Sequence, residues 1–200
     1  MMSAFESCTI QTHQLFRVID RRLQIFVKRS INEFMKFSNQ KFNGPMPIGL
    51  DRTHLKTLRA SSRYFATPKA DGIRVLCYAF EYYIDKVWHK MVALLNRSGE
   101  VFVVPNCMLA NKRYAGTIFD AELLDIGLLM FDSYAIDGIS LIHEPLKSRL
   151  CHAQHILDDL RMPFSLRLKP YVCLNSDYDM DTLDVDFATD GLVIVSAGAV

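Results

Sequence analysis

Lys69-Ala70-Asp71-Gly72-Ile73-Arg74 places a lysine beside an acid, a glycine and an arginine, between apolar, strand-like flanks. A lysine amine is nucleophilic only when it is unprotonated, and a free lysine has a pKa of about 10.4. Burial or a nearby cation such as Arg74 favours the neutral amine. Gly72 allows the backbone to approach a ligand where a side chain would clash. The stretch therefore fits a reactive lysine, and it fits a solvated charge cluster between two strands equally well.

The composition describes a nearly neutral chain with a large apolar fraction. Its 200 residues, half of them hydrophobic, suffice for one full core or for one domain with an appendage. The 23 basic and 22 acidic residues give a net charge of +1, which excludes a strongly basic coat, so any RNA contact must be local or come from a partner. The five cysteines lack C-x-x-C spacing, which predicts reduced thiols in an intracellular protein and no zinc site. No apolar run approaches the roughly 20 residues of a membrane span, and no signal peptide or membrane partner is expected.

The first part of the chain carries apolar residues at helical spacing from residue 12 to residue 37, with basic residues mostly between them. This pattern predicts one long amphipathic helix, which we assign to an N-terminal unit of residues 1–40. Its basic face is typical of a solvated surface, and it also fits a face that binds membranes or partners. The basic residues are Arg17, Arg21, Arg22, Lys28 and Arg29.

The rest of the chain changes to the pattern of strands. Glycines and prolines in residues 39–51 indicate an irregular linker, and residues 53–60 fit a short helix. A further helix is expected from Pro145 to Leu160, since proline suits a first helical position. The expected strands are 73–80, 91–95, 100–104, 117–124, 128–134, 165–172 and 192–196, with a hairpin turn at 96–99. A helix followed by mixed strands predicts an α+β domain built on antiparallel sheet.

Three further segments with acidic residues follow the lysine stretch along the chain: residues 118–123 (IFDAEL), 128–134 (LLMFDSY) and 189–194 (TDGLVI). Together with K-x-D-G-x-R at residues 69–74, they resemble the covalent nucleotidyltransferases, which comprise mRNA capping guanylyltransferases and polynucleotide ligases. The resemblance implies a nucleotidyltransferase (ATP-grasp-like) domain over residues 41–200, with antiparallel sheets and flanking helices.

The resemblance also implies roles for single residues. Lys69 would attack the α-phosphate of a nucleoside triphosphate, while Phe131 would stack on the purine. Glu122 and Asp190 would hold Mg²⁺ or Mn²⁺, since hard cations prefer carboxylate and phosphate oxygen. The remaining nucleotide-binding residues would be Asp71, Gly72, Arg74, Arg97 and Lys169. Taken singly, Glu122 also fits an exposed acid on a strand, Phe131 a core residue, and the Asp-Gly pair a turn.

Three details favour GTP over ATP and the capping branch over the ligases. Residues 42–47 (FNGPMP) resemble the F-P-G-x-Q-P entry segment of capping guanylyltransferases. Residues 96–102 resemble the family's hairpin, in which Arg97 would bind the triphosphate. Lys169, in a K-P-aromatic segment, would donate to guanine O6, where adenine offers an amino group instead. The expected reaction transfers GMP from GTP, through a lysyl-GMP intermediate, to the 5′-diphosphate end of RNA.

The resemblance covers residues 42–194 and stops before the family's lysine-rich motif and its OB-fold lid. We therefore expect a fragment, a split-gene product or a degenerate copy, with weak or absent self-guanylylation by itself. Expected partners are GTP, the RNA 5′ end, an OB-fold domain, and an RNA triphosphatase or methyltransferase. The expected location is the nucleus or, for a viral source, a cytoplasmic replication site. Two alternatives stay open: an ATP-dependent RNA or DNA ligase, and a non-catalytic capping scaffold.

Overall fold

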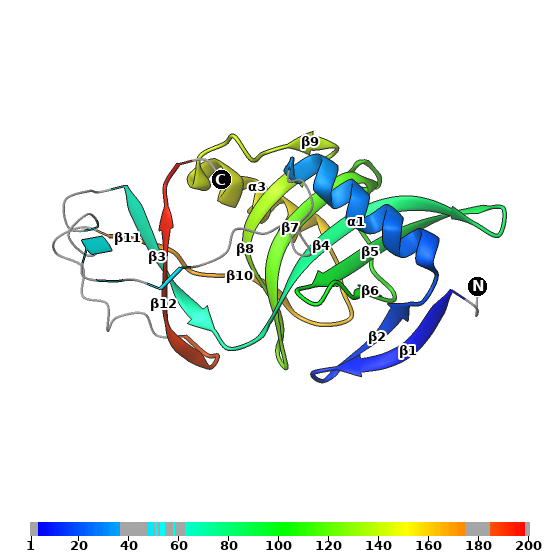
Figure 1. Ribbon diagram of the computed structural model, residues 1–200, viewed down its shortest axis with the longest axis horizontal. Helices are drawn as coiled ribbons and strands as arrows, with labels where there is room; N and C mark the ends of the chain where they lie inside the picture. Colours follow the sequence, from blue (N-terminus) through cyan, green and yellow to red (C-terminus); the bar gives the residue numbers. More distant parts are fainter. Residues whose placement is uncertain are drawn as a thin grey trace.

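The computed structural model describes residues 4–36, 48–49, 51, 53–54, 58, 63–174 and 185–198. Its strands form a nine-stranded sheet of order β1-β2-β6-β5-β4-β7-β8-β10, with β9 paired to β8, and a three-stranded sheet of order β11-β3-β12 (Figure 1). The strands are β1 (Phe5–Ile10), β2 (His13–Val18), β3 (Tyr64–Ala70), β4 (Ile73–Ile84), β5 (Val87–Asn96), β6 (Val101–Val103), β7 (Ala115–Leu124), β8 (Gly127–Ile136), β9 (Ile139–Ser140), β10 (Leu166–Leu168), β11 (Val172–Cys173) and β12 (Thr189–Ser196). The helices are α1 (Arg21–Met35), a 3-10 turn (Asn111–Tyr114) and α3 (Leu146–Asp159).

The mainly antiparallel α+β architecture confirms the coarse fold prediction. Every strand pair in the two sheets is antiparallel except β10 with β8. The expected β5–β6 hairpin is present, and its turn is closed by the N–H of Gly99 (φ +83°), which donates to the Asn96 carbonyl at 3.0 Å. The predicted linker 39–51 and short helix 53–60 lie mostly outside the described residues.

The prediction of one long helix over residues 12–37 is wrong. Residues 13–18 form β2, which pairs with β1 and β6, and α1 begins only at Arg21. Asp20 starts the helix, because its Oδ1 accepts a hydrogen bond from the N–H of Leu23 at 2.9 Å. The adjacent apolar residues Leu15 and Phe16 fit both periodicities, and pairing with β6 decides for the strand. The apolar residues inside α1 keep the predicted helical spacing: Leu23, Val27, Ile31 and Met35 are its buried side.

The predicted strand 165–172 is also wrong as a single element. β10 pairs with β8 in the large sheet, whereas β11 pairs with β3 in the small one. Lys169 and Pro170 lie between them, and proline cannot donate a hydrogen bond to a strand ladder. At this interruption the chain passes from the large sheet to the small one.

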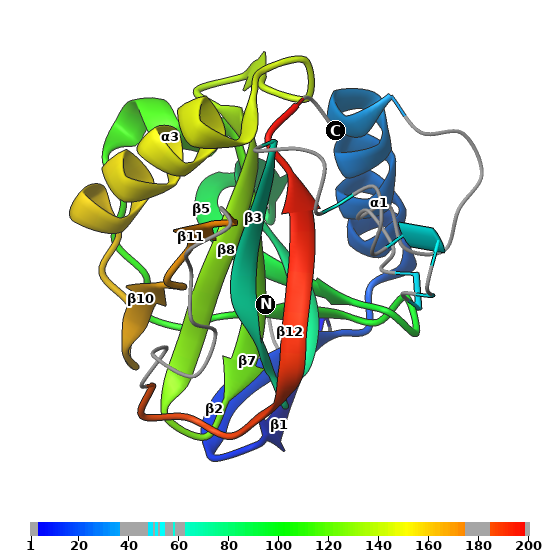
Figure 2. The ribbon, with the colours of Figure 1, turned by 90° about the vertical axis from the view of Figure 1, so that its left-hand side faces the viewer.

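The two helices cover opposite faces of the large sheet, as Figure 2 shows from the side. On one face, α1 shares a hydrophobic cluster with Leu76, Tyr78 and Phe80 of β4. On the other face, α3 shares a second cluster with Val75 and Cys77 of the same strand. Side chains alternate between faces along a strand, so Arg74 lies on the α1 face, two residues before Leu76. Cross-strand partners share a face, which places Asp120 (opposite Leu76) and Glu122 (opposite Arg74) there too.

Candidate active site

Lys69 lies near the end of β3, where the small sheet meets the large one. Its Nζ donates a hydrogen bond to Oδ2 of Asp190, at the start of β12. The register of β3 and β12 shifts between Thr189 and Leu192, and this irregularity sets Asp190 beside the lysine. Both side chains are about half exposed, at 46% and 53%. The amine is therefore accessible from solvent while it is paired with Asp190.

Lys69 opens onto a pocket of about 380 Å³. The β3–β4 connection, the β5–β6 turn and strand β7 meet there. Its lining comprises Lys69, Ala70, Asp71, Gly72, Ile73, Arg74, Asn96, Arg97, Ser98 and Glu122. Six of the predicted site residues are thus brought to one cavity from three separate stretches of chain. Of the other three, all within the described residues, Asp190 contacts Lys69, while Phe131 and Lys169 lie behind Glu122 and Arg74.

Gly72 is required by the protein's own packing. A Cβ at this position would lie 2.8 Å from the carbonyl oxygen of Leu123 and 2.6 Å from Cδ2 of Leu124. The glycine lets the β3–β4 connection rest directly on β7. Asp71 is fixed through its backbone, since its N–H donates to the Ala188 carbonyl at 3.0 Å, and its side chain is exposed. The neighbour that requires a glycine here is β7 of the protein itself, and the approach of a nucleotide to Gly72 stays a prediction.

Arg74 is held by an acid to which the sequence analysis assigned no role. Its Nε and Nη2 donate to Oδ1 and Oδ2 of Asp120 at 3.0 and 2.6 Å. The Tyr134 hydroxyl donates to the same carboxylate at 2.9 Å. Burial acts to lower the pKa of Arg74, but the charge of Asp120 outweighs it and the pKa is raised. Arg74 is therefore a fixed, charged side chain in the pocket lining, and Asp120 balances its charge.

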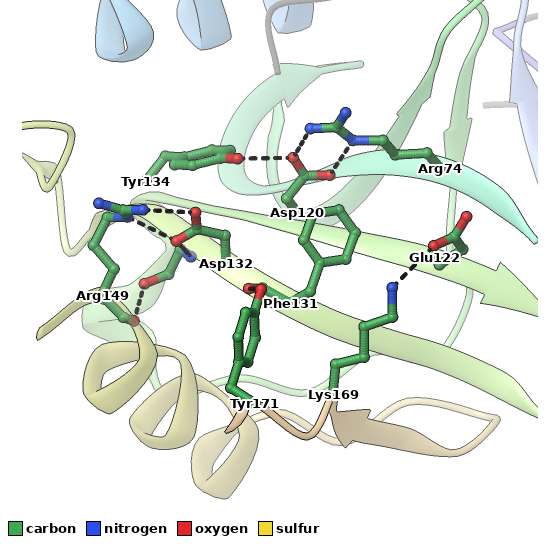
Figure 3. Close-up of polar contacts among 10 residues, drawn as sticks. Arg74, Asp120, Glu122, Phe131, Asp132, Tyr134, Arg149, Lys169 and Tyr171 are labelled. Carbon is green, nitrogen blue, oxygen red and sulfur yellow. Dashed lines mark hydrogen bonds and ion pairs between the residues drawn. The ribbon is translucent and has the colours of Figure 1, made fainter. Parts of the chain in front are cut away.

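Phe131 lies between two cations (Figure 3). The Arg74 guanidinium is 5.4 Å from the ring centroid and Lys169 Nζ is 5.0 Å from it. The backbone at this position is fixed by the Tyr171 hydroxyl, which donates to the Phe131 carbonyl at 2.7 Å. The ring is only partly buried, so one part of its surface remains available as a stacking platform.

Lys169 and Glu122 form a buried ion pair beside this ring. Lys169 Nζ lies 3.4 Å from Glu122 Oε2, and the two side chains are 4% and 16% exposed. Burial raises the pKa of Glu122 and lowers that of Lys169, while each partner's charge opposes these shifts. Perturbed groups of this kind are frequent at functional sites.

A second buried pair anchors α3 behind the site. Arg149 Nε and Nη2 donate to Asp132 at 2.8 and 3.0 Å, and Nη1 donates to the Glu144 carbonyl at 2.6 Å. Sequence reasoning assigned neither residue a role. The only available signal was an acid in an apolar strand and an arginine on the following helix, which does not reveal the pairing.

The donor set can accept a divalent cation that arrives with phosphates. Among the described residues there is no cluster of three histidines, cysteines or acids placed to hold a metal. The two candidate carboxylates, Glu122 and Asp190, are each engaged by a lysine. Mg²⁺ commonly uses one or two carboxylates, with substrate phosphates and waters as its other ligands. These residues therefore fit a substrate-borne ion better than a resident one.

Comparison with known proteins identifies a family and several relatives of this chain. Residues 8–199 match the family described as mRNA capping enzyme, catalytic domain. An mRNA-capping enzyme subunit alpha from Yarrowia lipolytica is 25% identical over 173 residues, covering 81% of this chain and 44% of the relative. The Schizosaccharomyces pombe subunit alpha is 29% identical over 139 residues, covering 62% and 34%.

The chain thus spans less than half the length of these relatives. No helix in the described part of the chain is long and apolar enough to cross a membrane. The family match covers nearly the whole sequence and confirms the resemblance to the capping branch of the nucleotidyltransferases. This chain belongs to the mRNA capping enzyme catalytic domain family.

Proposed function

We propose that this chain is the nucleotidyltransferase core of an mRNA guanylyltransferase. The observation that carries the proposal is the position of Lys69, an accessible amine at the mouth of a pocket that also holds Arg74, Arg97 and Glu122. The capping relatives support GTP as the nucleotide and the RNA 5′ end as the acceptor. The fungal relatives support a nuclear location, and the cytoplasmic site of a virus is the alternative.

The reaction has two balanced steps at Lys69. Its neutral amine attacks the α-phosphorus of GTP, an N–P bond forms as the nitrogen releases one proton to solvent, and pyrophosphate leaves as the α–β P–O bond breaks. A β-phosphate oxygen of 5′-diphosphate RNA then attacks the same phosphorus, the N–P bond breaks, and the lysine regains its proton. Asp190 orients the amine before the first step and is free to take a new partner once Lys69 carries GMP as a phosphoamide.

The remaining residues bind and position the nucleotide. Arg97, exposed on the β5–β6 turn, and Arg74, fixed at the pocket floor, supply positive charge for phosphates. Asp71 faces solvent at the pocket rim and can accept a sugar hydroxyl. Phe131 provides the stacking surface, and Lys169 donates to guanine O6 when it turns from Glu122.

Glu122 and Asp190 would hold Mg²⁺ or Mn²⁺ with the triphosphate. When bound, the ion neutralises charge on the phosphates and aligns the leaving group. Both carboxylates must first release their lysine partners, Lys169 and Lys69. An OB-fold domain, an RNA triphosphatase and a methyltransferase are the partners that we propose for the complete capping apparatus.

Label transfer from α-phosphate-labelled GTP tests the proposal, with ATP in parallel and with Mg²⁺ and Mn²⁺ in turn. Wild type, Lys69→Ala and the control Lys147→Ala, an exposed lysine on α3, are compared with and without a supplied OB-fold domain. A GTP-specific adduct that is absent only in Lys69→Ala supports the proposal. An ATP-specific adduct assigns the chain to the ligases. Absence of any adduct from folded protein under all conditions assigns it to a non-catalytic scaffold.

A further inference from the structure

The exposed side of α1 carries basic residues that the nucleotide pocket does not use. Arg21 and Arg22 are exposed in its first turn, and Lys28 follows Arg21 by seven residues, roughly 10 Å along the same side of the helix. In the described part of the chain, no carboxylate lies within ion-pair distance of these three, whereas Arg29 is paired with Glu33 at 2.9 Å. Arg22 lies about 100° further round the helix from Arg21. We call Arg21, Arg22 and Lys28 together the α1 basic face.

This face is continuous with the rim of the pocket. A Cβ placed on Gly99 would lie 3.6 Å from Lys28 Nζ, so the ammonium group rests against the β5–β6 turn. Arg97, two residues earlier in that turn, lines the pocket. The acid of the turn, Glu100, is neutralised by Arg17 at 3.1 Å. Figure 1 shows α1 lying along the large sheet near β5 and β6. With Arg97 in the pocket lining and Lys28 against the β5–β6 turn, positive side chains run from the pocket over the turn and onto the helix.

The charges on this face weaken the helix that carries them. The N-terminus of a helix is its positive end, and α1 has two arginines and no acid in its first turn. The N-cap Asp20 offsets part of this cost, because its carboxylate accepts the Leu23 N–H at 2.9 Å.

We infer that the α1 basic face binds the phosphate backbone of the acceptor RNA just downstream of its 5′ end. This inference rests on the proposed function, which brings an RNA 5′ end to Lys69. A membrane is disfavoured because the apolar side of α1, at Leu23, Val27 and Ile31, is fully buried against the sheet. A single strand leaving the pocket over Arg97 reaches Lys28 first and the two arginines next.

The test measures binding of an RNA of about ten nucleotides, with a 5′-diphosphate and a 3′ fluorophore, by fluorescence anisotropy across a salt series. The triple variant Arg21→Gln, Arg22→Gln and Lys28→Gln is compared with a control that removes the same charge elsewhere. That control replaces Lys86, Lys112 and Lys147 by glutamine, on the β4–β5 turn, the 3-10 turn and α3. Thermal melting checks that both variants fold.

We expect the α1 variant to bind about tenfold more weakly or worse at low salt, and to lose about 2 from the slope of log K against log salt, at roughly 0.7 per phosphate contact. The control should match wild type. The loss should persist with 5′-hydroxyl RNA, because it concerns the RNA body. Equal affinity and slope in wild type and the α1 variant would overturn the inference. So would an unchanged RNA affinity accompanied by loss of binding to phosphatidylserine vesicles.

Label transfer to Lys69 from GTP, measured on the same wild-type preparation, separates the two proposals. Wild type that fails to label even with a supplied OB-fold domain, while RNA affinity still depends on the α1 basic face, refutes the proposed function and supports the RNA contact. Wild type that labels, with RNA affinity independent of that face, refutes only the inference.

Discussion

Replacement of Asp120 by asparagine should expose how much of the fold depends on the buried partner of Arg74. The Asp120 side chain is fully buried and accepts hydrogen bonds from Arg74 Nε, Arg74 Nη2 and the Tyr134 hydroxyl. Asparagine removes the charge and turns one acceptor into a donor that faces the guanidinium. Breaking a buried ion pair on one side costs about 3–5 kcal/mol, because the other charge is left buried without compensation. At about 2–4 °C per kcal/mol for a chain of this size, the melting temperature should fall by roughly 6–20 °C.

Urea unfolding and thermal melting measure this change against two further variants. Glu33→Gln breaks the exposed pair with Arg29, whose side chains are 63% and 79% exposed, and should cost about 0.5 kcal/mol or less. Asp120→Leu combined with Arg74→Met removes both charges, and should recover most of the loss. A cost below about 1 kcal/mol for Asp120→Asn, comparable with the surface control, would refute the reasoning that this pair is a desolvated, structural element.

Three other changes follow from the geometry. Gly72→Ala should destabilise the fold by about 1–3 kcal/mol in urea unfolding, because its Cβ meets the Leu123 carbonyl at 2.8 Å, and an unchanged midpoint would contradict that contact. Phe131→Leu should weaken GTP binding by about 1–3 kcal/mol in calorimetry if the ring stacks on the base, whereas an unchanged affinity would remove that role. Burial lowers the pKa of Lys169 in the native state, whereas in the unfolded chain it is about 10.4. At pH values between these two pKa values, the unfolded chain therefore binds more protons than the native one. The free energy of unfolding of wild type minus that of Lys169→Met should therefore increase as the pH rises from about 8 to 10, and a flat or falling difference would show that the pKa is not lowered.

The parts of the fold that sequence predicts well are those fixed by local pattern. Apolar, aromatic-rich runs located β4, β7 and β8, which are buried on both faces, and turn residues located the β5–β6 hairpin. The helix opened by Pro145 was located for the same kind of reason, a local start signal. The N-terminal error arose where local pattern is ambiguous: Leu15 and Phe16 extend the helical spacing, and a long-range pairing with β6 overrides it.

In the candidate site, too, local motifs could be recognised from the sequence, whereas long-range partners could not. The motif order indicated Lys69, Arg97 and Glu122 as neighbours, and they line one pocket. The ion-pair partner of Arg74 could not be predicted from the sequence. Asp120 lies 46 residues away and becomes its neighbour only through the register of β4 and β7. Asp120 shares a face with Glu122 by simple alternation, so its presence near the site was available as a signal, although its pairing was not.

The central claim is that Lys69 becomes covalently linked to GMP, and peptide mapping by mass spectrometry after incubation with GTP tests it most directly. The chain would be mixed with GTP, a divalent cation and a supplied OB-fold domain, then digested under conditions that preserve phosphoamides. We predict the mass of one GMP on the peptide that contains Lys69, no AMP adduct on that peptide when ATP replaces GTP, and no adduct in Lys69→Ala. That variant should fold normally because the ion pair of Lys69 is exposed. GMP on a different residue, or an adduct that persists in Lys69→Ala, would contradict the account.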